Sequence, residues 1–167
     1  NTKDNIDLST SGGGIRADNC SGNIRLVTSG GSIRLSELQG TIKASTSGGP
    51  VHGRSIKGEL VARTSGGGVE LSDLACSVEA HTSGGNMDVE ITELGNYVTI
   101  SNSGGNIQLE LPGKKGIDLK LRGNRIKIQD LNNFSGEQDE HRITGKINGG
   151  GIPVEVRTSG GITMAFE

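Results

Sequence analysis

The chain has 167 residues, of which 29 are glycine and only 2% are aromatic, and its formal net charge is −2. A deep globular core needs bulky apolar side chains, so this composition argues against an ordinary globular domain. The near-neutral charge argues against a nucleic-acid-binding protein, which would be basic overall. No apolar run approaches the ~20 residues that a transmembrane helix needs.

A Ser-Gly-Gly motif recurs along the chain. It begins at Ser11, Ser29, Ser47, Ser65 and Ser83, at a constant spacing, and again at Ser103 and Ser159. Apolar anchors divide this spacing in half, at nine-residue steps from Ile6 to Met87. Each anchor opens an alternating apolar and polar pattern, which is typical of a β-strand with one buried face.

A unit of two short strands cannot bury its own apolar face, but stacked copies can. We therefore predict an all-β fold, namely a single parallel β-solenoid of about eight 18-residue coils with two strands per coil. The Gly12-Gly13 pair and Gly22 with their repeats mark the two corners, where positive φ or close backbone approach is expected. Thr10, Thr28, Thr46, Thr64 and Thr82 form one column that shares the parity of the buried residues, so we expect them to point inward.

Further along the chain the period slips twice. The step from Met87 to Val98 is longer than the usual nine, which lengthens one strand. The polar segment 129–142 is rich in turn formers and is interpreted as an irregular loop excursion, or as one irregular half-coil around Leu131 and Phe134. The repeat otherwise runs to Phe166, so we expect one solenoid domain over residues 1–167. Residues 162–166 keep the strand pattern with little visible cap, and we expect end-to-end or edge association, or further sequence, to cover an end.

Two longer patterns carry a resemblance. Residues 28–49 read TSGG-x-I-x-L…L-x-G-x-I-x-A-x-TSGG, and residues 143–161 read I-x-G-x-I-N-G-G-G-x-P-V-x-V-x-T-S-G-G. They resemble bacterial adhesin-like β-solenoid domains of unknown function. The resemblance implies the solenoid fold, an adhesion role and an exported location in the bacterial cell envelope (periplasm, outer-membrane surface or extracellular). It implies no catalytic residue.

Several β-solenoid chemistries are disfavoured by the motif details. Calcium-binding β-rolls carry Asp after their glycine corners, and Asp is missing from every copy here. Hexapeptide acyltransferases step by six residues rather than nine. We therefore predict no metal, no cofactor and no catalytic residues. The alternative is a polysaccharide lyase or hydrolase on a β-helix scaffold, which would use the stacked carboxylates of Glu70 and Asp88 or the 129–142 segment.

Basic residues recur at equivalent outward positions. Arg16, Arg34 and His52 occupy one column in successive coils, and Arg25 and Lys43 occupy another on the opposite sheet. Such columns are either a solvated face or a site for anionic glycans. We predict a non-catalytic envelope module for adhesion, recognition or scaffolding. Its expected partner is an envelope or host polysaccharide or protein, without nucleic acid and without a transmembrane segment.

The two cysteines lie about three coils apart in this register. That separation, ~14 Å at one strand spacing per coil, exceeds the ~7 Å limit between the Cα atoms of a disulfide. Cys20 and Cys76 are therefore predicted to be free thiols, Cys20 in an apolar slot and Cys76 in the slot of a corner glycine.

Overall fold

The fold is seen in a computed structural model that describes residues 4–129 and 131–167. The regular secondary structure of these residues is entirely β, so the described chain has no helix long and apolar enough to cross a membrane. The strands are β1 (Asp4–Thr10), β2 (Ile15–Asp18), β3 (Ser21–Thr28), β4 (Ile33–Thr46), β5 (Val51–Thr64), β6 (Val69–Thr82), β7 (Met87–Asn102), β8 (Ile107–Leu111), β9 (Ile117–Arg122), β10 (Arg125–Ile128), β11 (Phe134–Gln138), β12 (Arg142–Ile147), β13 (Ile152–Thr158) and β14 (Gly161–Phe166).

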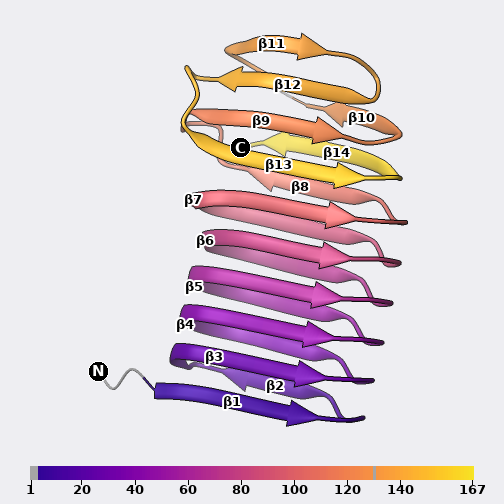
Figure 1. Cartoon of the computed structure of the whole chain (residues 1–167). Coiled ribbons are helices and arrows are strands. Elements are labelled where there is room, and N and C mark those ends of the chain that lie inside the picture. The colour runs from indigo at the N-terminus through magenta and orange to yellow at the C-terminus, as the bar shows by residue number, and fades with distance from the viewer. Residues whose placement is uncertain (1–3, 130) are drawn as a thin grey trace.

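The strands stack into a rod with a front and a back layer (Figure 1). The front layer follows the order β1-β3-β4-β5-β6-β7-β13-β9-β12-β11, and the back layer follows β2-β4-β5-β6-β7-β8-β14-β10. Strands β4 to β7 belong to both layers, because each bends midway and continues on the other side. The predicted all-β parallel solenoid is therefore confirmed.

The strands pair in the register that the repeat predicts. Ile42 of β4 lies beside Leu60 of β5, which lies beside Val78 of β6. All three side chains are fully buried. Full burial of such a side chain is worth about 1.5–3 kcal/mol, and the anchors from Ile24 to Ile117 repeat it along the rod.

The bend inside the long strands is built from residues with positive φ. Asn19, Glu37, Ser55 and Asp73 take φ values of 51° to 54° at equivalent positions in successive coils. Three residues after the first three of them, Gly22, Gly40 and Gly58 take φ values of 109° to 123°. Glycine adopts this conformation without the steric cost that a side chain adds, which explains the second glycine column.

The Ser-Gly-Gly corner depends on close approach between coils rather than on positive φ. A Cβ atom on the second glycine of the motif, as at Gly49, would overlap the carbonyl group of Gly31 in the preceding coil. From Thr28 onward, the threonines that precede the motif point inward, as expected, and are at most 6% exposed. Their hydroxyl groups bond the backbone of the preceding coil, as Thr46 does to the carbonyl oxygen of Gly31 at 2.8 Å.

The C-terminal coil is inserted into the stack out of chain order. Strand β13 lies between β7 and β9 in the front layer, and β14 lies between β8 and β10 in the back layer. The last strands are therefore internal, and the expectation that residues 162–166 form an uncapped end is wrong. Both edges of β14 are occupied by hydrogen-bonded neighbours, which gives these residues the ladder that an end coil would lack.

The end of the rod beyond β9 is closed by an antiparallel hairpin. Strand β11 lies within the segment 129–142, which we expected to be an irregular loop, and pairs with β12. Strand β12 in turn pairs antiparallel with β9. The solenoid has about six turns, compared with the eight expected, and residues 134–147 form a hairpin instead of a coil.

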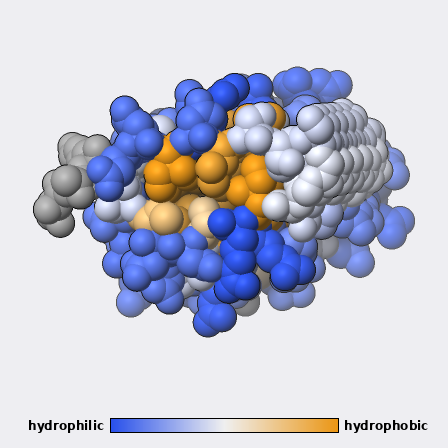
Figure 2. Space-filling view, turned by 90° about the horizontal axis from the view of Figure 1, so that it is seen from below, coloured by the Kyte–Doolittle hydropathy of each residue, from blue (hydrophilic) through white to orange (hydrophobic). Residues whose placement is uncertain are grey.

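The opposite end of the described rod is formed by β1, whose outer edge has no neighbour among the described residues. Leu8 on this strand is 47% exposed, and no other large hydrophobic residue among those described is exposed. Figure 2 views the rod from this end and shows apolar side chains of the interior framed by polar ones.

Candidate functional site

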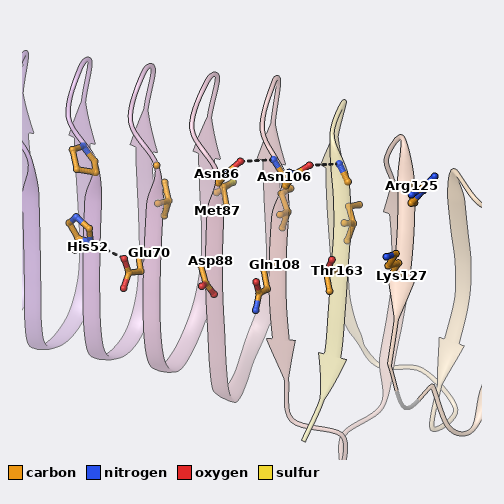
Figure 3. Close-up of a pocket in the computed structure, with 16 residues that line it drawn as sticks. His52, Glu70, Asn86, Met87, Asp88, Asn106, Gln108, Arg125, Lys127 and Thr163 are labelled. Atoms are coloured by element: carbon orange, nitrogen blue, oxygen red, sulfur yellow. Dashed lines mark hydrogen bonds and ion pairs between the residues drawn. The ribbon is translucent and has the colours of Figure 1, made fainter.

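A shallow groove of about 650 Å³ runs across the back layer, from β5 to β10. One side of the groove is a column of outward residues near the start of each strand (Figure 3). In spatial order these residues are His52, Glu70, Asp88, Gln108, Thr163 and Lys127. Because neighbours in the column sit on adjacent strands, the groove presents one polar side chain about every 4.8 Å.

The other side of the groove contains a ladder of asparagine amides. The side-chain oxygen of Asn86 accepts a hydrogen bond from the Asn106 backbone N–H at 3.0 Å. The side-chain oxygen of Asn106 accepts one from the Gly161 backbone N–H at 2.8 Å. These bonds fix the carbonyl side of each amide and leave the amide NH₂ groups as donors beside the groove.

Beneath the groove lie the first residues of the back-layer strands, such as Val69, Met87 and Ile107, whose side chains belong to the core and are at most 2% exposed. These side chains offer a ligand almost no surface. A ligand in the groove would therefore bind chiefly through the polar groups along both sides.

The charge of the groove changes along its length. Glu70 and Asp88 make its middle acidic, while Arg125 and Lys127 make the β10 end basic. Next to the groove, the pKa of Glu110 is raised because its carboxyl group shares a hydrogen bond with that of Glu167, with a smaller contribution from burial.

The predicted basic columns exist in the register expected. Arg16, Arg34 and His52 lie side by side on β2, β4 and β5, and the last of them belongs to the groove. Arg25 and Lys43 lie side by side on β3 and β4 in the front layer.

Three members of these columns lie within ion-pair distance of carboxylate groups. Arg16 Nε lies 2.5 Å from Asp18 Oδ2, Arg25 Nη1 lies 3.4 Å from Asp7 Oδ1, and His52 Nδ1 lies 3.5 Å from Glu70 Oε2. Within residues 4–129 and 131–167, Arg34 and Lys43 form no ion pair. These two cations are therefore the ones that a ligand could reach without breaking a contact described here.

Glu70 and Asp88 are neighbours on β6 and β7, as the stacked column requires. The Glu70 side chain is 71% exposed. In glycosidases, burial of a carboxyl group lets it act as a general acid near neutral pH. The exposed face that carries Glu70 and Asp88 provides no such burial. Among the described residues, no group of three or more His, Cys, Asp or Glu side chains could hold a metal ion.

The structure also contains a row of cations that sequence reasoning missed. Arg157 of β13, Arg122 of β9 and Arg142 of β12 lie side by side on the front layer. Their sequence positions share no period, because β13 is inserted out of order and β12 runs antiparallel. The repeat thus contained no signal for this row, and only the strand order reveals it.

The cysteines are free, as predicted. Cys76 pairs with Gly58 in the corner column and is 1% exposed. Desolvation by this burial raises the pKa of its thiol to about 12. Cys20 is only partly buried, which differs from the expectation, because its coil lies at the end of the described rod.

Comparison with known proteins adds one finding. The family model described as Toastrack DUF4097 matches residues 1–164, nearly the whole chain. No curated protein matches the chain. No solved structure matches it either.

Proposed function

The chain belongs to the Toastrack DUF4097 family, a β-solenoid family of unknown function, and from this premise we propose that it is a non-catalytic binding module of the exported bacterial cell envelope. Its proposed ligand is an extended anionic polysaccharide of the envelope or of a host, held for adhesion, recognition or scaffolding. The observation that supports the proposal best is the groove, which repeats polar side chains at the strand spacing along the rod.

An extended polymer fits this groove better than a compact ligand does. The groove crosses six neighbouring strands of the back layer, and each presents an equivalent position. The spacing of about 4.8 Å between strands is close to the length of one sugar residue in an extended chain. Successive sugars could therefore meet successive strands, with their hydroxyl groups at the Asn86 and Gln108 side chains.

The cations favour a polymer with negative groups. The groove column continues beyond His52 to Arg34, which has no ion pair among the described residues. At the other end, Arg125 and Lys127 line the groove. Carboxylates of the polymer would bind at these two ends, and its neutral hydroxyl groups would donate to Glu70 and Asp88 between them.

A catalytic role has less support. Hydrolysis or elimination needs a nucleophile or base, an acid and a stabilising group that converge on one bond. Glu70 and Asp88 lie in an open groove on the outer face of the sheet. The nearest basic side chain in the groove column, His52, contacts Glu70. The groove residues are spread along a line rather than gathered around a point.

The experiment that tests the proposal measures binding of polygalacturonate, a uronic-acid polymer, by isothermal titration calorimetry, with neutral dextran as the comparison. The double variant Arg16→Glu, Arg34→Glu is expected to weaken binding at least tenfold. The double variant Lys57→Glu, Lys114→Glu makes the same change of charge at two exposed positions outside the groove and is the matched control. Equal binding by the wild type and the double variant would remove the glycan proposal.

The same mixtures decide between binding and catalysis. Chromatography of the polymer after incubation is expected to show unchanged chain length. Release of shorter products that is lost in Glu70→Gln would instead establish the enzyme. Fractionation of the producing cells tests the location, which is expected to be the envelope fraction.

A further inference from the structure

We propose a second binding site, on the front layer, in which the row Arg157–Arg122–Arg142 binds a ligand with tetrahedral oxyanion groups, phosphate or sulfate, arranged in a line. This site shares no residue with the groove and lies in the other layer of the rod. The proposal therefore goes beyond the polysaccharide proposal and can succeed or fail without it.

The register places the three guanidinium groups on neighbouring strands. Arg157 pairs with Arg122 in the parallel ladder of β13 and β9, and Arg122 pairs with Arg142 in the antiparallel ladder of β9 and β12. Side chains at paired positions point to the same face of a sheet. All three residues are exposed, so a ligand reaches them without moving the backbone.

Like charges at paired positions repel each other, and a sheet normally places opposite charges there. The front layer shows the usual arrangement at its other end, where Arg25 pairs with Asp7 and its Nη1 lies 3.4 Å from Asp7 Oδ1. In the row itself, Arg157 has one carboxylate contact, with Glu155 at 3.7 Å. Arg122 and Arg142 have no ion pair within residues 4–129 and 131–167.

Among the described residues, one acidic group near the row forms an ion pair with it, namely Glu155 with Arg157. Asp139, in the turn between β11 and β12, accepts hydrogen bonds from the backbone N–H groups of His141 and Arg142 at 2.7 and 2.8 Å. Glu137 and Glu155 line a hollow beside the row, and Lys120 lies in the same hollow. Four cationic side chains thus share this hollow with two carboxylates, and Asp139 and Glu140 lie with Arg122 and Arg142 around an adjoining hollow.

The hollow gives the ligand a place. It has a volume of about 380 Å³ and runs between the arginine row and the neighbouring outward column, which includes Lys120, Thr144 and Glu155. Thr144 contributes a hydroxyl group that can donate to an anion. The hollow thus combines three guanidinium groups, one ammonium group and one hydroxyl group along three strands.

The chemistry of the row selects tetrahedral oxyanions. A guanidinium group is planar and donates two parallel hydrogen bonds to a pair of oxygens. The oxygens of a phosphate or sulfate point in several directions, so one group can bridge two neighbouring arginines. A carboxylate has only two oxygens, which lie in one plane, so it offers fewer directions in which a second arginine can donate. A line of phosphates or sulfates therefore matches a line of three arginines on adjacent strands.

The test uses inorganic tripolyphosphate and sulfated dextran as probes, with the binding of each measured by isothermal titration calorimetry at fixed ionic strength. The double variant Arg122→Gln, Arg142→Gln is expected to weaken binding at least tenfold. Arg63→Gln lies in the same layer and removes one charge from an existing ion pair, so it is the matched control for the single variant Arg157→Gln and is expected to bind as the wild type does. Arg157→Gln is a separate single variant, should the double variant fold poorly by circular dichroism.

Each outcome decides the proposal. Binding of tripolyphosphate alone identifies a small phosphate ligand, and binding of sulfated dextran alone identifies a sulfated polymer; both support the site. Failure of both probes to bind overturns it. Equal weakening by Arg63→Gln and by the row variants also overturns it, because the attraction would then come from overall charge. The Arg16→Glu, Arg34→Glu variant is expected to keep this binding, which separates this site from the groove.

Discussion

The Thr64 hydroxyl group donates a hydrogen bond of 2.8 Å to the carbonyl oxygen of Gly49, in the preceding coil. It also accepts a bond of 3.2 Å from the backbone N–H of Gly67. One side chain therefore satisfies two backbone groups at a corner, where the strand ladder is interrupted. The same arrangement recurs at Thr28, Thr46 and, as a donor, Thr82.

Replacement of Thr64 by valine is expected to destabilise the protein by about 1–3 kcal/mol, since the shape is kept and two buried backbone groups lose their partner. Urea unfolding followed by circular dichroism measures the loss. Thr99→Val, at an exposed strand position, is the control and is expected to change the stability by less than about 0.5 kcal/mol. Equal effects of the two substitutions would show that the corner bonds contribute nothing.

Adjacent glycines of one corner are expected to respond differently to alanine. A Cβ atom at Gly49 would overlap the backbone carbonyl group of Gly31, whereas one at Gly48 would lie 3.5 Å from its nearest neighbour, an ordinary contact. Gly49→Ala should therefore cost about 1–3 kcal/mol or more, because a neighbouring coil must shift. Gly48→Ala should be close to neutral. Thermal unfolding of the two variants checks this, and a similar melting temperature for both would contradict the packing of the corner.

The regular part of the fold was predictable from the sequence because spatial neighbours lie one repeat apart along the chain. Ile33, Val51 and Val69 share a column in the sequence repeat and are neighbours in the structure. In a solenoid, residues one repeat apart in the sequence become neighbours in space. The surface columns that contain Arg16 and Arg25 could therefore be predicted from the 18-residue spacing.

The C-terminal third was not predictable in the same way. Nothing in the period says that β13 should lie between β7 and β9, because its alternating pattern fits any slot in the stack. The polar segment before Arg142 contains few apolar anchors, so the sequence carries no clear alternating pattern that would predict its pairing into a hairpin. The arginine row depends on both features, and for that reason it was found only in the structure.

The turn of the hairpin should make the stability of this end sensitive to acid. Hydrogen bonds from the backbone N–H groups of His141 and Arg142 hold the pKa of Asp139 below its usual value of 3.8. A carboxyl group whose pKa is lower in the folded than in the unfolded protein stabilises the fold at pH values above its unfolded-state pKa. This stabilisation is lost as the pH falls through the folded-state pKa. Carboxyl-carbon NMR is expected to show Asp139 titrating below 3.8.

A pair of variants connects that carboxylate to the turn. Asp139→Ala is expected to speed amide exchange in β11 and β12, because the two backbone bonds are lost. Asp88→Ala removes the same charge from the back layer and should leave exchange in the hairpin unchanged. Exchange rates that are equal in the two variants would mean that Asp139 does not organise the turn.

The two free thiols are expected to differ in reactivity. The thiolate is the nucleophilic form of cysteine, and burial raises the pKa of Cys76 to about 12, so at pH 8 very little of it is ionised. Cys20 is partly exposed. A thiol reagent such as DTNB should therefore label Cys20 readily in the native protein and Cys76 only as the protein unfolds. The variants Cys20→Ser and Cys76→Ser identify each site, and urea at rising concentration should release Cys76 along the unfolding curve. Prompt labelling of native Cys20→Ser protein would show that the coil around Cys76 opens without global unfolding.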